Sequence, residues 1–468
     1  IPEASTPIHH CLTLSSGVRA TSFFLKGSHM VFLSAIVTKI VRKNCIFADM
    51  IYKSLKKNII YSSILTAANY IFPLVTYPYV SRVLGVDNIG VCNFVDSVIN
   101  YFILFSMLGI STVGIREISQ ARNDRTRLNK TFSRLFTINT ISTSIVLIAL
   151  LISTFTVPQL KENSHLMWIG VLKLVSNYLL IEWLYKGLEE FKYITSRTVL
   201  VKCLYVVAVF LFIKSPEDTT RYYMLLTLMI TGNALINIVH SRKYVNYSLT
   251  LEKSSPLVKS IIILGIYAFL TSMYTTFNVV YLGFECGDTE VGYYATSTKI
   301  YRMILSIFTA VTGVMMPRLA SLLSEGKFET FRNLLKKSFR ILFVFFIPTS
   351  VLICIFAPQI INIIAGVGYE GAIMPLRIIS PLLLIIGLEQ IIIIQGLMPM
   401  KKDKEVLINS AAGAVTGILA NLILVPQYGA TGAAIAWFAA ECVVLTSSCI
   451  FFIKAMKTIP RTDNSQDS

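Results

Sequence analysis

Long apolar blocks constrain the fold of this chain more than any other feature of its sequence. The blocks follow one another with short polar gaps, and about 20 apolar residues in a helix are enough to cross a bilayer core. Hydrophobic residues make up 54% of the 468 residues and charged residues only 14%, whereas soluble proteins have about 25% charged residues. The sequence therefore predicts an all-α polytopic membrane protein.

The apolar blocks predict about twelve transmembrane helices. The predicted spans are 58–80, 89–113, 137–157, 166–185, 195–213, 222–241, 258–283, 294–316, 340–358, 373–397, 406–425 and 430–453.

Basic residues are concentrated in alternate gaps between these spans. Of the 37 Lys and Arg residues after Met50, 29 lie in one set of gaps and their flanks, 5 in the other set and 3 within spans. Cytoplasmic loops are enriched in Lys and Arg, so both termini are predicted to lie in the cytoplasm of a bacterium, with the spans in its inner membrane. This pattern also explains the net charge of +17 without a nucleic-acid partner.

The first 49 residues differ from the rest of the chain. Their apolar stretch at 31–48 is interrupted by Lys39, Arg42 and Lys43, and Met50 opens a basic segment directly before the first strong span. We expect translation to start at Met50 and residues 1–49 to lie outside the fold. A peripheral amphipathic anchor is the alternative. Residues 459–468 are expected to form a cytoplasmic tail.

The two halves of the chain contain a weak internal repeat. A shift of 202 residues superimposes Gly85 on Gly287, Gly90 on Gly292 and Arg116 on Arg318. Two six-helix lobes of the same orientation are therefore predicted, at 50–250 and 251–458. Parallel repeats of this kind are typical of transporters that bind substrate between the repeats.

Two strings carry a family resemblance. VSRVLGVDNIGVCNF at 80–94, and the segment at 397–437, resemble the Wzx-type oligosaccharide flippases, the polysaccharide-export branch of the MOP superfamily. The resemblance extends from Met50 to about residue 455. In the segment at 397–437 the resemblance rests mostly on Asn421, Pro426, Tyr428, Gly429, Gly432 and Ala433. The resemblance implies a two-lobed, MATE-like fold. It also implies that the protein is a transporter and not an enzyme.

The resemblance also implies a function and partners. Such a flippase moves an undecaprenyl-diphosphate-linked oligosaccharide from the inner to the outer leaflet by alternating access, for O-antigen and lipopolysaccharide synthesis. Its expected partners are that lipid, the surrounding membrane lipids, and a polymerase and glycosyltransferases of the same pathway.

One face of the span at 294–316 is polar and doubly basic. The residues recur at helical spacing: Ala295, Lys299, Arg302, Ser306, Thr309 and Gly313. Charges inside a membrane span are costly and usually face a cavity, so we predict a cationic cavity that binds an anionic substrate. Its predicted lining is Arg302, Lys299, Asp96, Asn278 and Tyr274. For Lys299 and Arg302 the alternative is that the side chains reach the membrane surface, which is the expected behaviour of Lys173.

Two acidic residues, Glu389 and Glu441, lie near the middle of their spans. They are possible coupling carboxylates that carry a proton, partners of Lys299 or Arg302, or hydrogen-bonded structural residues. The eight cysteines and five histidines show no metal-ligand spacing, so neither metal nor cofactor is expected.

Three other function classes compete with the flippase hypothesis. A MATE-like multidrug exporter would need acidic residues in the cavity, whereas the stripe is basic. A membrane polysaccharide polymerase or glycosyltransferase would be expected to carry a long external loop, whereas the predicted external loops are short. A structural scaffold would have no reason to keep charges within its spans.

Overall fold

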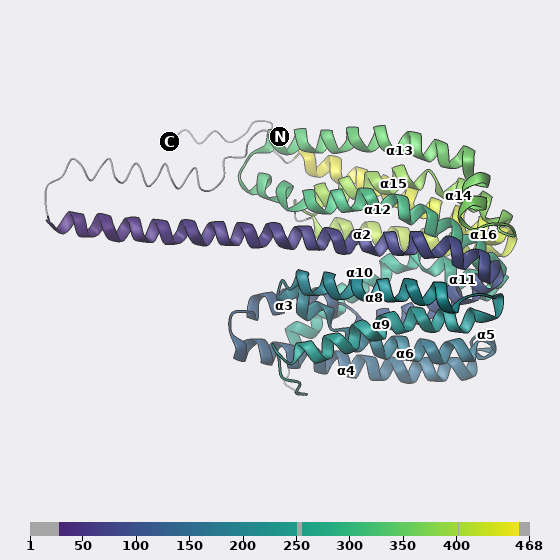
Figure 1. Ribbon diagram of the computed structural model, residues 1–468. Helices are drawn as coiled ribbons and strands as arrows, with labels where there is room; N and C mark the ends of the chain where they lie inside the picture. Colours follow the sequence, from purple (N-terminus) through teal and green to yellow (C-terminus); the bar gives the residue numbers. More distant parts are fainter. Residues whose placement is uncertain (1–27, 250–254, 401, 458–468) are drawn as a thin grey trace.

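The computed structural model describes residues 28–249, 255–400 and 402–457, and throughout these ranges the chain folds into helices and connecting loops without a strand (Figure 1). In the described residues, nine helices are long and apolar enough to cross a membrane. Two of them are bent, at Gly85 and Gly429. The helix bent at Gly429 contains two predicted spans, and the helix bent at Gly85 contains the span 58–80 and the span 89–113 as far as Met107. Another predicted span lies on α12 (Asp288–Ser324). The prediction of an all-α polytopic protein is confirmed.

The first half of the chain forms one bundle, in which α6 packs against α9, and α2 packs against α4, α6 and α8. Its elements are α2 (Ser28–Met107), α3 (Ile110–Ala121), α4 (Arg125–Thr156), α5 (Pro158–Glu162), α6 (Ser164–Leu180), α7 (Glu182–Gly187), α8 (Phe191–Phe212), η1 (Pro216–Asp218) and α9 (Thr219–Ser241). Residues 1–27, where most of the expected N-terminal extension falls, lie outside the described residues, and the backbone of 28–49 continues α2.

The second half forms the other bundle, in which α16 packs against α10, α11, α14 and α15. Its elements are α10 (Ser255–Thr275), α11 (Phe277–Cys286), α12, α13 (Phe328–Ile364), η2 (Glu370–Ala372), α14 (Ile373–Ile379), α15 (Leu382–Glu389), the π-helical η3 (Gln390–Leu397) and α16 (Asp403–Lys457). The expected tail at 459–468 lies outside the described residues.

Large apolar side chains cover the outside of the bundles. Ile145 on α4 is 64% exposed and Val344 on α13 is 71% exposed. Continuous apolar surface of this kind is unfavourable in water and is expected where helices face lipid.

Two glycines at repeat-related positions bend the chain in the same way. Gly85 has φ 81° and ψ 170°, and Gly287 has φ 85° and ψ −175°. A positive φ is unfavourable for residues with a Cβ, so these two turns need glycine. The agreement shows that the weak sequence repeat corresponds to a repeated backbone conformation.

Repeat-related glycines also let the two halves touch where α2 crosses α12. A Cβ on Gly90 would lie 1.8 Å from the carbonyl oxygen of Asp288, and one on Gly292 would lie 2.4 Å from that of Val86. The shift of 202 residues relates Val86 to Asp288 as well as Gly90 to Gly292, so the contact is reciprocal. Only residues without a side chain permit this approach.

This crossing defines one end of the molecule. We call it the acidic end, because it includes η1 and the start of α12; the opposite, basic end includes the connections at 122–124 and 325–327, on the left in Figure 1. Several hydrogen bonds join the halves near the acidic end, among them Tyr77 Oη with Thr296 Oγ1 at 2.7 Å, Thr289 Oγ1 to Asp87 Oδ1 at 2.5 Å, and Tyr369 Oη to the carbonyl of Ser81 at 3.0 Å.

Candidate functional site

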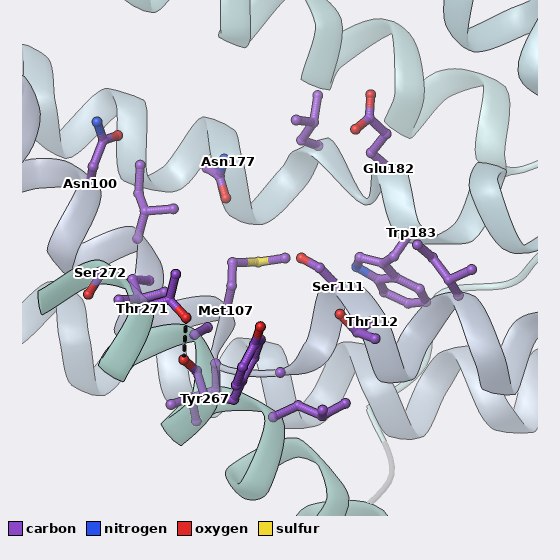
Figure 2. Close-up of a pocket in the computed structure, with 18 of the residues that line it drawn as sticks. Asn100, Met107, Ser111, Thr112, Asn177, Glu182, Trp183, Tyr267, Thr271 and Ser272 are labelled. Atoms are coloured by element: carbon purple, nitrogen blue, oxygen red, sulfur yellow. Dashed lines mark hydrogen bonds between the residues drawn. The ribbon is translucent and has the colours of Figure 1, made fainter. Parts of the chain in front are cut away.

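Two connected chambers lie between the halves. The charged chamber, of about 310 Å³, is lined by α2, the α10–α11 junction and α12, and includes Asp96, Lys299 and Arg302. The large chamber, of about 690 Å³, is lined by α2, α3, α6, α7 and α10 and lies toward the basic end of the molecule (Figure 2). Asn100 and Thr275 line both chambers, so the two chambers meet at these residues.

The single acid of the charged chamber is already paired. Lys173 on α6 donates to Asp96 Oδ1 at 2.5 Å and to Asn100 Oδ1 at 2.9 Å, and Asn100 Nδ2 donates to Asp96 Oδ2 at 3.0 Å. Asp96 and Asn100 are four residues apart and share one face of α2. The Lys173 side chain is only 10% exposed, so the structure places it in a buried ion pair instead of at the membrane surface. The pair adds no net charge to the chamber.

The two cations that α12 contributes to the charged chamber, Lys299 and Arg302, have no acidic partner among the described residues. Lys299 Nζ lies 4.1 Å from the centroid of the Tyr77 ring, and Arg302 Nη2 donates to the carbonyl of Thr275 at 3.3 Å. In the part of the chain that the structure describes, neither forms an ion pair. Arg302 is exposed in the chamber. The charged chamber therefore has an excess of two positive charges.

The structure places two other predicted lining residues elsewhere. Asn278 is fully buried, donates to Tyr294 Oη at 2.8 Å and accepts from Asn421 Nδ2 at 2.7 Å. Tyr274 packs against α16, where a Cβ on Gly417 would lie 3.1 Å from its Cβ. Both side chains thus hold α10 and α11 against α16, and neither lines the charged chamber.

Glu389 and Glu441 come together inside the second half. Glu441 Oε1 accepts from Trp437 Nε1 at 2.8 Å, and the Glu389 carboxyl lies close to the Glu441 carboxyl. They are 7% and 2% exposed and line neither chamber. The structure therefore pairs them with each other and not with Lys299 or Arg302.

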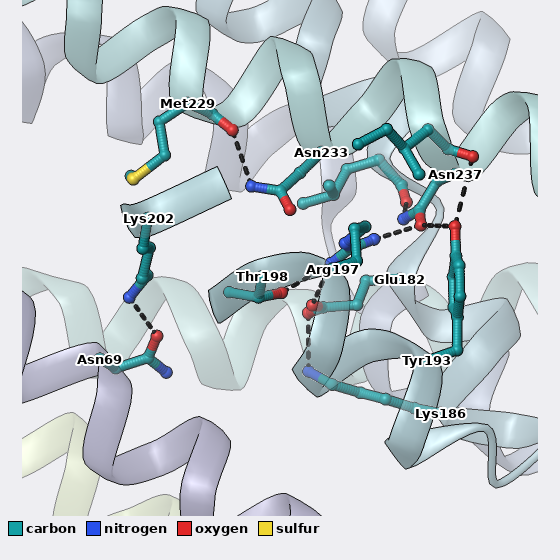
Figure 3. Close-up of polar contacts among 12 residues, drawn as sticks. Asn69, Glu182, Lys186, Tyr193, Arg197, Thr198, Lys202, Met229, Asn233 and Asn237 are labelled. Carbon is teal, nitrogen blue, oxygen red and sulfur yellow. Dashed lines mark hydrogen bonds and ion pairs between the residues drawn. The ribbon is translucent and has the colours of Figure 1, made fainter. Parts of the chain in front are cut away.

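Sequence reasoning missed a buried polar network at the base of the large chamber. Arg197 on α8 is 6% exposed, bonds to Asn237 Oδ1, and lies 3.5 Å from Glu182 Oε1 (Figure 3). Glu182 also pairs with Lys186 at 2.9 Å, and Glu182 and Lys186 both line the chamber. Buried charges need such partners, but the partners are too far apart in sequence for local spacing to reveal them.

Comparison with known proteins gives one matching family. It is described as "Polysaccharide biosynthesis protein" and matches residues 55–323. A protein of Escherichia coli (strain K12) named "Putative O-antigen transporter" is 28% identical over 416 residues, which cover 87% of this chain and 98% of that protein. A protein of the same name from Shigella dysenteriae is 25% identical over 416 residues, covering 86% of this chain and all of that protein.

Solved structures share the fold. A structure titled "Lipid II flippase MurJ, inward closed conformation" superimposes with a TM-score of 0.68 at 16% identity, covering 86% of this chain and 90% of that one. An inward-facing multidrug resistance MATE family transporter of the MOP superfamily superimposes with a TM-score of 0.59 at 15% identity, covering 83% of this chain and 94% of that one. The predicted MATE-like and MOP-like fold is confirmed.

Proposed function

Because the chain belongs to the polysaccharide biosynthesis protein family, we propose that it moves a polyprenyl-diphosphate-linked oligosaccharide from the inner to the outer leaflet of a bacterial cytoplasmic membrane. It is a multi-pass membrane transport protein, and two relatives are named for O-antigen transport. No covalent bond is made or broken in the proposed step. The protein supplies a polar path for the headgroup while the lipid tail stays in the bilayer.

The unbalanced charge of the charged chamber carries the proposal. A diphosphate diester has two negative charges at neutral pH, and Lys299 and Arg302 lack acidic partners in the described part of the chain. A guanidinium offers forked N–H donors to phosphate oxygens, and an ammonium adds a compact charge. A multidrug exporter of the same fold would need a free carboxylate for cationic drugs, but Asp96 already accepts from Lys173 at 2.5 Å.

The reciprocal crossing of α2 and α12 supports alternating access. Backbone contact and several hydrogen bonds join the halves near the acidic end, whereas the large chamber lies toward the basic end. If the basic loops are cytoplasmic, as positive charge in loops indicates, this arrangement corresponds to a state closed toward the outside. Separation of α2 from α12 would then release the headgroup outward.

We expect reporter fusions to give a cytoplasmic signal in the loops at 122–134, 243–257, 325–337 and 400–405. Fusions at 214–221 and 284–290 should give an external signal, because the basic residues are so unequally divided between the two sets of loops. Paired alkaline phosphatase and fluorescent-protein fusions would measure both. An external signal from 325–337 would contradict the orientation on which the proposed direction of transport depends.

Binding of the headgroup tests the proposal in a purified system. Protein in lipid nanodiscs should bind undecaprenyl diphosphate more tightly than undecaprenol, which has the same tail and no charge. The preference should fall when Arg302 is replaced by alanine, since that variant loses half of the excess positive charge. Equal binding of the two lipids by the wild-type protein would contradict a diphosphate site in the charged chamber.

A further inference from the structure

We propose that the large chamber binds the uncharged glycan of the substrate, and that Trp183 is a specificity-determining hydrogen-bond donor to it; this inference rests on the function proposed above. This second subsite lies beside the diphosphate site, so the protein distinguishes substrates by their glycan, and Trp183 is the side chain that does so.

The lining of the large chamber suits a ligand rich in hydroxyl groups. Amides, hydroxyls and an indole lie among apolar side chains such as Ile103, Leu104 and Leu264 around the space, and the polar lining includes Asn100, Asn177, Ser111, Thr112, Tyr267 and Thr271. Figure 2 shows Asn177 pointing into the chamber from α6. Its charged lining residues, Glu182 and Lys186, pair with each other at 2.9 Å. Such a surface offers many hydrogen bonds but no excess charge, which favours a neutral sugar over an acidic one.

Trp183 has a buried donor with no acceptor among the described residues. The residue is 2% exposed and lines the chamber, and Nε1 makes no hydrogen bond in the described structure. Buried indole N–H groups normally find an acceptor, and an orphaned one is costly. In Figure 2 the indole nitrogen lies on the side facing Ser111 and Met107. A hydroxyl or acetamido oxygen of a bound sugar can supply the missing acceptor.

The indole cannot turn to find another partner. One side is so close to α3 that a Cβ on Gly114 would lie 2.9 Å from the ring, and Phe132 stacks at a centroid distance of 5.5 Å. Packing against Gly114 and Phe132 therefore holds the ring, which presents its N–H in a fixed direction. A donor fixed in this way is suited to select a ligand that has an acceptor at the matching position.

The two chambers meet next to Arg302, where the diphosphate of the substrate would be joined to its first sugar. Arg302 binds the carbonyl of Thr275 at 3.3 Å, and Thr275 lines both chambers. A diphosphate held by Arg302 would therefore have its first sugar at the entrance of the large chamber. The larger volume, about 690 Å³ against about 310 Å³, lies on the glycan side.

The test compares three lipids bound to protein in nanodiscs: bare undecaprenyl diphosphate, the same lipid carrying one N-acetylglucosamine, and the same lipid carrying one glucuronic acid. The wild-type protein should bind the neutral glycolipid about fivefold more tightly than the bare lipid, as one added hydrogen bond provides. The acidic glycolipid should gain less. Trp183→Phe keeps an aromatic ring against Gly114 and Phe132 but removes the N–H, so it should abolish the gain and leave binding of the bare lipid unchanged.

Two further variants make the result specific. Trp168→Phe is the matched control, because Trp168 is 51% exposed and lines neither chamber; it should keep the full preference. Asn177→Ala, at a half-buried position, should lose part of the preference without loss of fold. Survival of the preference in Trp183→Phe, absence of a preference in the wild type, or equal gain for the acidic glycolipid would overturn the inference. Failure of the wild type to bind the bare lipid would instead refute the diphosphate site, and this inference with it.

Discussion

Replacement of Arg302 by alanine is expected to lower export by about tenfold to a hundredfold while the protein still inserts normally. The side chain is exposed in the charged chamber and makes one described hydrogen bond, to a backbone carbonyl, so its loss leaves the packing largely intact. A charge-assisted hydrogen bond is worth roughly 1.5–3 kcal/mol, which gives the expected range. In cells that depend on this protein for export, lipid-linked oligosaccharide should accumulate in the inner leaflet.

The nature of the substitution separates a phosphate contact from a general need for polarity. Arg302→Lys should restore transport only in part, because the ammonium keeps the charge but loses the forked geometry. Arg302→Glu should be worse than alanine, because it places an anion opposite an anion. Arg221→Ala is the matched control, since Arg221 lies in the first turn of α9, outside both chambers, with its side chain 72% exposed. Equal export per inserted molecule by the three Arg302 variants would exclude this residue as a phosphate ligand.

A disulfide across the α2–α12 crossing is expected to stop transport almost completely and reversibly. Asp87 and Thr289 meet with their side-chain oxygens 2.5 Å apart, so Asp87→Cys combined with Thr289→Cys brings two thiols close together. A disulfide would hold the halves in the state closed toward the outside, whereas the proposed cycle requires them to separate there. Export should fail after oxidation and return after reduction.

The control for this experiment joins residues of one half only. Ser133 Oγ and Ser248 Oγ lie 2.8 Å apart within the first half, and Ser133→Cys with Ser248→Cys should crosslink without loss of export. Both pairs need a background in which the eight natural cysteines are replaced. Full export with the Asp87–Thr289 pair quantitatively crosslinked would show that the acidic end does not open during transport.

The helices, and the basic face of α12 in the site, could be predicted from the sequence because both depend on local periodicity. Apolar blocks of sufficient length can only cross a membrane as helices, and a spacing of three or four residues places Lys299 and Arg302 on one face of α12. The 202-residue shift likewise identified glycines whose conformations agree. These features can be predicted because they depend only on spacing within a single helix or on a constant offset between the two halves of the chain.

The rest of the site depends on which helices become neighbours, and spacing along one helix carries no information about that. From the sequence, Lys173 is expected near a membrane surface. In the structure α6 packs beside α2, and Asp96 neutralises the charge of Lys173. Asn278 has the helical spacing expected of a cavity residue. In the structure it is buried, and it accepts a hydrogen bond from Asn421 on α16. The sequence gives no indication of Trp183, because its proposed role arises from the acceptor that its indole N–H lacks among the described residues.

Translocation in a defined membrane tests the central claim most directly. Purified protein would be reconstituted in liposomes that contain undecaprenyl-diphosphate-linked N-acetylglucosamine, and the fraction of the lipid accessible to an impermeant galactosyltransferase added outside would be followed over time. The protected inner-leaflet pool should become accessible much faster with the wild-type protein than in protein-free liposomes, and Arg302→Glu should abolish this acceleration. A wild-type rate equal to that of protein-free liposomes, or to that of Arg302→Glu, would contradict translocation of the headgroup through the charged chamber.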